Sequence, residues 1–135
     1  MPILEWTDDE VAEFIKERNI KCAPLYYDEQ GNFHVERRLG CIGCPLANKK
    51  KRIAEYVRYP KIIKRTIECE QEFIDTHRNG KIAARYKDAV HRMYANLFCD
   101  SYPEYQDRVS GGLFPELAID PKAFLENYFK IDLTI

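Results

Sequence analysis

Apolar residues spaced three or four positions apart recur along most of the chain, and this spacing predicts a mainly helical protein. Thr7 and Glu10 have the T-x-x-E spacing of a capping box, which satisfies free backbone N–H groups where a helix begins. The first helix is therefore expected over about residues 8–18. Its apolar face consists of Val11, Phe14 and Ile15.

Two further helices are expected on either side of a break at Tyr59-Pro60. Residues 49–58 suit the first, and Pro60 opens the second because proline is tolerated at the first helical position. Gly80 supplies the stop signal of the second helix. The apolar faces are Ile53, Tyr56 and Val57 in the first helix, and Ile63, Ile67, Phe73 and Ile74 in the second.

A fourth helix is predicted by the apolar face of residues 82–97, and a last short helix opens at Asp120 before Pro121. Between these two helices the chain is expected to be irregular after Cys99, because prolines and glycines interrupt the helical spacing. The interrupting residues are Pro103, Gly111, Gly112 and Pro115.

The β structure expected from the sequence is one short hairpin. Pro24 disfavours helix in the residue before it, and residues 28–32 (Asp-Glu-Gln-Gly-Asn) have turn composition. The predicted strands are residues 25–27 and 33–36, with an irregular loop over 37–48. The predicted fold class is thus mainly α (α+β at most): a single helix-rich domain over residues 1–135 with a small β-hairpin and an irregular cysteine loop.

Composition places this chain of 135 residues, 45% hydrophobic and 32% charged, among folded domains rather than disordered ones. No apolar run approaches the roughly 20 residues of a membrane-spanning helix, and the N-terminal segment lacks the basic and apolar regions of a signal peptide. A cytoplasmic location without a membrane partner is therefore expected, where five cysteines stay reduced.

Charge is concentrated in one segment, because residues 37–65 carry ten Lys/Arg and a single acid, Glu55. A net charge of +9 over this segment indicates an anion nearby: a nucleotide phosphate, a sulfate, a nucleic acid or a thiolate-bound cluster. The alternative is that residues 49–52 are one solvated helix face balanced by the acidic ends. The candidate anion-binding residues are Arg37, Arg38, Lys49, Lys50, Arg52 and Lys61.

Inside the basic segment, Cys41 and Cys44 form a CxxC motif that is able to chelate a metal or act as a redox pair. Gly43 and Pro45 favour a tight turn there. Zinc or a cubane cluster usually needs four ligands, and Cys22 is the best third candidate. The fourth is open among Cys69, Cys99 and His34, although a buried core position is favoured for both cysteines.

Two other motifs do not predict chemistry. Residues 110–112 (Ser-Gly-Gly) have neither a strand before them nor a helix after them, as a phosphate-binding loop needs. Asp88 and His91 match no local catalytic signature, so His91 is expected to be structural.

Several blocks follow one another over about residues 2–65. They are residues 3–7 (ILEWT), 14–15 (FI), 19–20 (NI), 24–26 (PLY), 38–47 (RLGCIGCPLA) and a basic helix ending at 59–61 (YPK). In this order they resemble the C-terminal part of the phosphoadenosine phosphosulfate (PAPS) reductase family. Residues 66–135 share mainly a helical character with that family and are interpreted as a helical extension.

The resemblance implies an upstream α/β domain with an SGGxDS-type nucleotide loop, which these 135 residues do not contain. It also implies that Cys41 and Cys44 bind a [4Fe–4S] cluster, as the corresponding CxxC does in adenylylsulfate reductases, whose other two ligands come from the upstream domain. The family's catalytic Glu-Cys-Gly-x-His motif is absent, because Glu70 follows Cys69. The catalytic residues are therefore unknown.

Three interpretations follow. The first is a PAPS-reductase-like domain that holds an iron–sulfur cluster or zinc, serves reductive sulfonucleotide or sulfur-transfer chemistry and is not active alone. It would need a nucleotide-binding partner domain or chain, and a sulfonucleotide or other anionic ligand. The alternative is a zinc-stabilised module that binds protein or nucleic acid through residues 37–65. The third is a metal-free helical domain with a vestigial CxxC.

Overall fold

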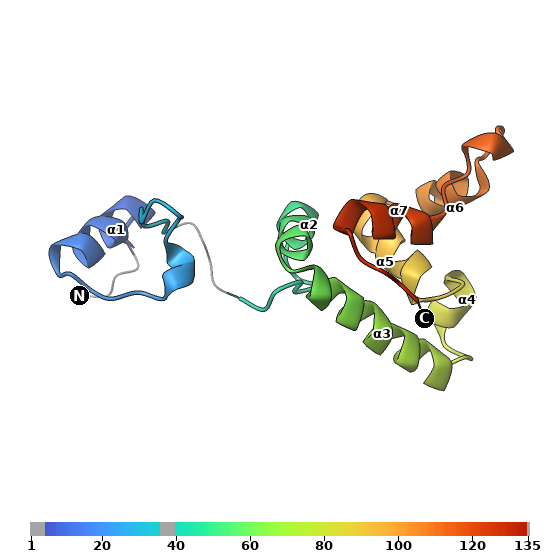
Figure 1. The fold of residues 1–135 in the computed structure, drawn as a ribbon, viewed down its shortest axis with the longest axis horizontal. Helices are drawn as coiled ribbons and strands as arrows, with labels where there is room; N and C mark the ends of the chain where they lie inside the picture. The colour runs from blue at the N-terminus through green and yellow to red at the C-terminus, as the bar shows by residue number, and fades with distance from the viewer. Residues whose placement is uncertain (1–4, 36–39, 135) are drawn as a thin grey trace. The chain divides into compact units, whose positions relative to one another are not determined.

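The computed structural model describes residues 5–35 and 40–134, and the chain divides into two compact units, residues 1–41 (unit 1) and 42–135 (unit 2). The predicted mainly helical class is confirmed, because the described residues form seven α-helices and a single isolated β-bridge (Figure 1). The expectation of one domain over residues 1–135 stays a prediction.

Unit 1 begins with helix α1 (Asp8–Glu17), close to the predicted bounds. The predicted capping box is confirmed: the Thr7 amide donates to Glu10 Oε2 at 2.7 Å, and the Glu10 amide donates to Thr7 Oγ1 at 3.3 Å. The hydrogen bonds that the Thr7 amide and hydroxyl donate to the Glu10 carboxylate lower the pKa of Glu10.

The predicted hairpin reduces to one antiparallel bridge between Tyr27 and Phe33, and the short 3₁₀ helix η2 (Pro24–Tyr26) occupies the position of its first strand. The turn between them is confirmed, because Asp28 accepts hydrogen bonds from the Gln30 and Asn32 amides at 3.0 and 2.7 Å. Proline fits the first turn of a 3₁₀ helix, which explains why this segment is not extended. Residues 36–39 lie outside the described residues.

Unit 2 opens with helices α2 (Lys49–Arg58) and α3 (Pro60–Thr76), which begin at the predicted residues. The Asn48 side chain caps α2 by accepting from the Lys51 amide at 2.8 Å. Val57 and Phe73 were assigned to the apolar faces, but their side chains are 53% and 47% exposed. The buried face of each helix therefore contains fewer residues than the apolar face predicted from the sequence.

The single helix predicted over residues 82–97 is two helices, α4 (Lys81–Arg85) and α5 (Ala89–Phe98). Asp88 interrupts the pattern because its carboxylate caps α5, accepting from the His91 amide at 2.9 Å. A short polar side chain at this position thus ends one apolar face and begins another. Gly80, the predicted end of α3, is the residue before α4, and α3 itself ends at Thr76.

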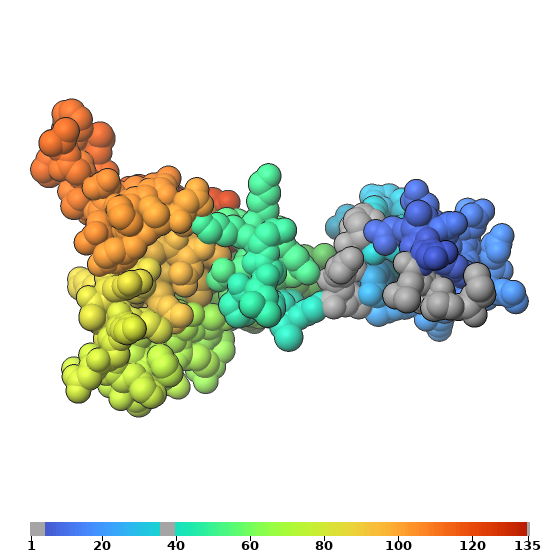
Figure 2. All heavy atoms as spheres, turned by 180° about the vertical axis from the view of Figure 1, so that it is seen from behind, coloured from blue at the N-terminus to red at the C-terminus, as the bar shows by residue number. Residues whose placement is uncertain are grey.

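Helix α6 (Tyr102–Ser110) occupies a segment that was expected to be irregular. Ser101 caps it by accepting from the Glu104 amide at 3.3 Å, and the Glu104 carboxylate accepts from the Asp100 amide at 2.6 Å. The 3₁₀ helix η3 (Pro115–Leu117) follows, and together with the end of α6 it extends from the rest of unit 2 (Figures 1 and 2).

Helix α7 (Pro121–Phe129) begins where Asp120-Pro121 predicted it. It packs with α2 and α3 around α5, which carries more buried side chains than any other helix of the described residues. The buried core is therefore in unit 2, whereas no described side chain of unit 1 is buried. The largest fully buried side chains are Tyr56, Tyr94, Ile63, Ile67, Met93, Leu97, Leu125 and Leu133.

None of the helices formed by the described residues combines the length and the apolar composition needed to cross a lipid bilayer.

Candidate functional site

The cysteine loop leads directly into α2 and is held by two side chains of that helix. The Gly43 amide donates to Glu55 Oε2 at 2.8 Å, and the Tyr56 hydroxyl donates to the Gly43 carbonyl at 3.4 Å. A turn follows, in which the Ala47 amide donates to the Cys44 carbonyl at 3.0 Å. The loop is therefore fixed on both sides of Gly43.

Gly43 is the residue that lets the loop lie against the core. Its φ of +70° belongs to the left-handed region that favours glycine. A Cβ at this position would lie close to the Tyr56 ring, 2.4 Å from the hydroxyl oxygen. Because Tyr56 is 1% exposed, the ring belongs to the packed core of unit 2 and has little room to move.

The three cysteines predicted as metal ligands differ in exposure and in the unit that carries them. Cys41 is exposed and Cys22 is half-buried, both in unit 1, and Cys44 is half-buried in unit 2. The CxxC motif thus spans the boundary of the two units. The proposed ligand set of these three cysteines stays a prediction.

The candidates for a fourth ligand have other surroundings. Cys99 is buried as expected, and burial raises the pKa of its thiol, which disfavours the thiolate that binds metals. Cys69 was expected to be buried, but it is exposed on α3. His34 Nε2 lies 3.0 Å from Asp28 Oδ2, and this contact is the main cause of an Asp28 pKa well below the usual range.

The donor set fits half of a four-ligand metal site. Cys41 and Cys44 supply soft thiol donors at chelating spacing. Within residues 5–35 and 40–134, however, no three His, Cys, Asp or Glu side chains lie together as a metal-holding group. These residues do not complete a site, so no reaction step is derived through a metal.

The predicted anion-binding residues do not share one environment. Lys49 is engaged within unit 2, where its Nζ donates to the Cys99 carbonyl and lies 2.7 Å from Asp100 Oδ1. Lys50 and Lys61 are exposed. Arg37 and Arg38 lie outside the described residues. The assignment of these residues to an anion stays a prediction.

Arg52 takes part in a charged cluster between α2, α3 and α5. Arg92 Nη1 lies 3.4 Å from Glu70 Oε2, and both arginines lower the Glu70 pKa, although burial outweighs them and raises it. The Arg52 Nε is buried, and no described residue accepts its hydrogen bond. The charge of Arg52 therefore acts on Glu70 within unit 2.

Removing the Glu55 carboxylate tests how the cysteine loop is held. Glu55→Ala is expected to lower the free energy of unfolding by about 1–3 kcal/mol, because the half-buried Gly43 amide loses a charged acceptor. Glu55→Gln should lose less, since its amide oxygen still accepts. Urea unfolding measures both, with exposed Glu116→Ala as the control. Equal losses for Glu55→Ala and Glu116→Ala would contradict this role.

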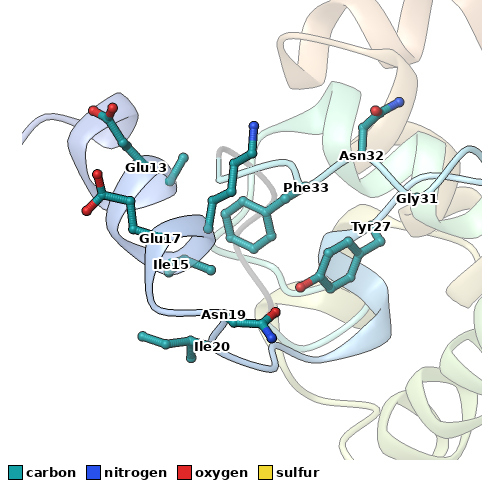
Figure 3. Close-up of a pocket in the computed structure, with 11 residues that line it drawn as sticks. Glu13, Ile15, Glu17, Asn19, Ile20, Tyr27, Gly31, Asn32 and Phe33 are labelled. Carbon is teal, nitrogen blue, oxygen red and sulfur yellow. The ribbon is translucent and has the colours of Figure 1, made fainter.

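Unit 1 contains a separate pocket of about 990 Å³ between α1 and the turn that joins Tyr27 to Phe33. Figure 3 shows Ile15 on the side of Phe33 and Asn19 on the side of Tyr27, whereas Glu13 and Glu17 of α1 point away from the two rings. The lining of this pocket mixes apolar and polar residues, and it contains none of the predicted site residues.

Sequence reasoning missed the residues that fix the candidate loop. Glu55 was noted only as the single acid of the basic segment, and Tyr56 only as part of an apolar face. Local spacing gave no signal for either contact, because each joins α2 to a residue twelve or thirteen positions earlier in the chain. The rejection of residues 110–112 as a phosphate loop agrees with the structure, where Gly111 is the left-handed cap of α6.

Residues 1–47 match the family model described as the phosphoadenosine phosphosulfate reductase domain. A protein of Escherichia phage 186, named as an uncharacterized 37.8 kDa protein in the gpa 5′ region, is 35% identical to this chain over 79 residues. The match covers 58% of this chain and 22% of the phage protein, so the chain spans about a fifth of the relative it matches. No solved structure matches the chain.

Proposed function

We propose that this chain is the cysteine-bearing part of a PAPS-reductase-like protein, in which Cys41 and Cys44 hold an iron–sulfur cluster or zinc. The observation that carries the proposal is the anchored loop, in which Glu55 and Tyr56 fix Gly43 between the two cysteines. The family-model match supports it, since residues 1–47 include Cys22 and both CxxC thiols. A bound cluster would supply electron transfer or electrostatic stabilisation.

The remaining ligands and the nucleotide site would come from a partner domain or chain. Only two thiols are available in the loop, and a cubane needs four ligands. The phage relative is several times longer than the matched segment, so a related protein has ample chain for such a domain. The proposed chemistry, reductive cleavage of a sulfonucleotide or sulfur transfer, therefore belongs to the completed protein, and this chain is expected to be inactive alone.

Anaerobic reconstitution of the full chain with iron, sulfide and excess small-molecule thiol, or with zinc, followed by metal analysis tests the proposal, because the added thiol substitutes for the ligands that the partner would supply. We expect bound iron with sulfide, or zinc, and its complete loss in Cys41→Ser/Cys44→Ser, because serine oxygen is a poor ligand for both. Cys69→Ser is the matched control, since Cys69 is an exposed cysteine on α3. Equal metal contents of all three proteins, or none in the wild type, would contradict the proposal.

A second candidate function is a zinc-stabilised module that binds nucleic acid through residues 37–65. The exposed Lys50 and Lys61 favour it, because both side chains are accessible for phosphate contacts. Colourless zinc together with nucleic-acid binding that weakens steeply with salt would select this function. Lys50→Gln/Lys61→Gln should then reduce the salt dependence by about two phosphate contacts.

A further inference from the structure

A pocket of about 500 Å³ in unit 2 has no counterpart in the function proposed above. It lies between the segment that follows α4 and helix α6, outside the residues matched by the family model. Two cations, Arg85 and Lys87, line it together with His91, Tyr102, Tyr105 and Gln106. No carboxylate belongs to its described lining. A concave site whose lining carries two cations and no carboxylate suits an anion.

His91 lines this pocket, and a contact with Asp88 fixes its ring. Its Nδ1 lies 2.8 Å from Asp88 Oδ1, and an ionised carboxylate only accepts, so Nδ1–H is the donor. The remaining ring nitrogen, Nε2, is then the group available to the pocket that His91 lines. A neutral Nε2 accepts from a protonated phosphoryl oxygen, and a protonated one donates to an ionised oxygen.

The two cations are available for a ligand. Within residues 40–134, neither Arg85 nor Lys87 lies within ion-pair distance of a carboxylate, unlike Arg92 and Arg108. The Arg85 guanidinium lies 5.7 Å from the centre of the Tyr102 ring. The Tyr102 hydroxyl donates to the Arg85 carbonyl at 3.0 Å, which fixes the backbone that carries this cation.

The aromatic floor of the pocket adds no negative charge. Burial raises the pKa of Tyr105 to about 12, so its hydroxyl stays protonated at neutral pH. The Tyr105 ring contacts Tyr86 and Tyr102 at centroid distances of 5.3 and 5.8 Å. These contacts pack the three rings against one another.

We propose that this pocket binds the phosphate or sulfate group of a small ligand, with Arg85 and Lys87 supplying charge and His91 Nε2 a directed hydrogen bond. The site is separate from Cys41 and Cys44, because its lining residues come from α4, α5, α6 and the residues between α4 and α5. It therefore adds an oxyanion site to the helical part of the chain.

An NMR titration of the full chain with inorganic phosphate, at constant ionic strength, tests this site. We expect saturable shifts at Arg85, Lys87 and the His91 ring, and at least about tenfold weaker binding for Arg85→Gln/Lys87→Gln, because two charge-assisted contacts are lost. Arg78→Gln/Lys81→Gln removes the same charge outside the pocket lining and should bind normally. Cys41→Ser/Cys44→Ser should also bind normally, which separates this site from the proposed metal function.

A parallel titration with sulfate determines whether the pocket distinguishes phosphate from other oxyanions. Equal affinities identify a general oxyanion site, and tighter phosphate binding that His91→Phe abolishes assigns the extra contact to a protonated phosphoryl oxygen on Nε2. Shifts that do not saturate, or equal weakening by both double variants, would overturn the proposal, because either shows only diffuse attraction to surface cations.

Discussion

Gly43→Ala is expected to lower the free energy of unfolding of the chain by about 2–5 kcal/mol, one of the two largest losses expected from a single substitution here. Left-handed backbone costs a non-glycine residue about 1–2 kcal/mol. The new methyl group also meets the Tyr56 ring, which the core surrounds, and overpacking of this kind costs about 1–3 kcal/mol.

Two other glycines separate these contributions in the same urea-unfolding experiment. Gly112 has φ +57° with nothing within 4 Å of its Cβ position, so Gly112→Ala should show the backbone cost alone. Gly40 has open space and no positive φ, so Gly40→Ala should stay within about 0.5 kcal/mol of wild type. A loss for Gly43→Ala no larger than that for Gly112→Ala would show that Tyr56 does not hold the loop.

Leu125→Ala is expected to cost about 2–5 kcal/mol, because Leu125 is fully buried where α7 packs on α5 and its removal leaves a cavity. Leu113→Ala is the matched control, since Leu113 is 91% exposed in the segment between α6 and η3. Its effect should stay within about 0.5 kcal/mol.

Thermal and urea unfolding measure the two leucine variants side by side. A near-neutral Leu125→Ala would mean that α7 is not part of the cooperative core. Helix α7 would then unfold before the rest of unit 2, and a spectroscopic probe placed near Phe129 would report a separate, earlier transition. Coincident transitions with a lowered midpoint are the expected result.

The sequence predicted helix starts best where a capping side chain, a proline or both marked the first turn. Thr7 begins α1, Pro60 begins α3, and Asp120-Pro121 begins α7 as expected. At these positions, side-chain oxygens or a fixed φ act within a few residues, so no tertiary contact is needed to decide the boundary.

The wrong predictions of secondary structure arose where one residue was compatible with two different local structures. Prolines and glycines around α6 suggested an irregular segment, yet Pro103 lies in the first helical turn, where a missing N–H costs nothing, and Ser101 caps the helix. The hairpin failed because Pro24 began a 3₁₀ helix in place of a strand. Asp88 divided one predicted helix in two by capping the second.

The candidate site was only partly visible in the sequence. The CxxC spacing predicted a thiol pair, but Glu55 and Tyr56 contact Gly43 from twelve and thirteen residues away, and such contacts follow from how α2 packs. The pocket beside His91 combines residues from positions 85–110, and periodicity gave no sign that they would lie together. The contact between His91 and Asp88 was not foreseen as part of a binding site, because the spacing of these two residues matches no local catalytic signature.

The bond between the cysteine loop and Tyr56 has a thermodynamic consequence. Because Gly43 packs on a ring of the folded core, a ligand that binds only the folded loop stabilises the whole of unit 2 by mass action. The melting temperature then rises with ligand concentration. A thermal-shift screen of this chain would therefore detect loop ligands of any chemical class, without a spectroscopic signal from the ligand itself.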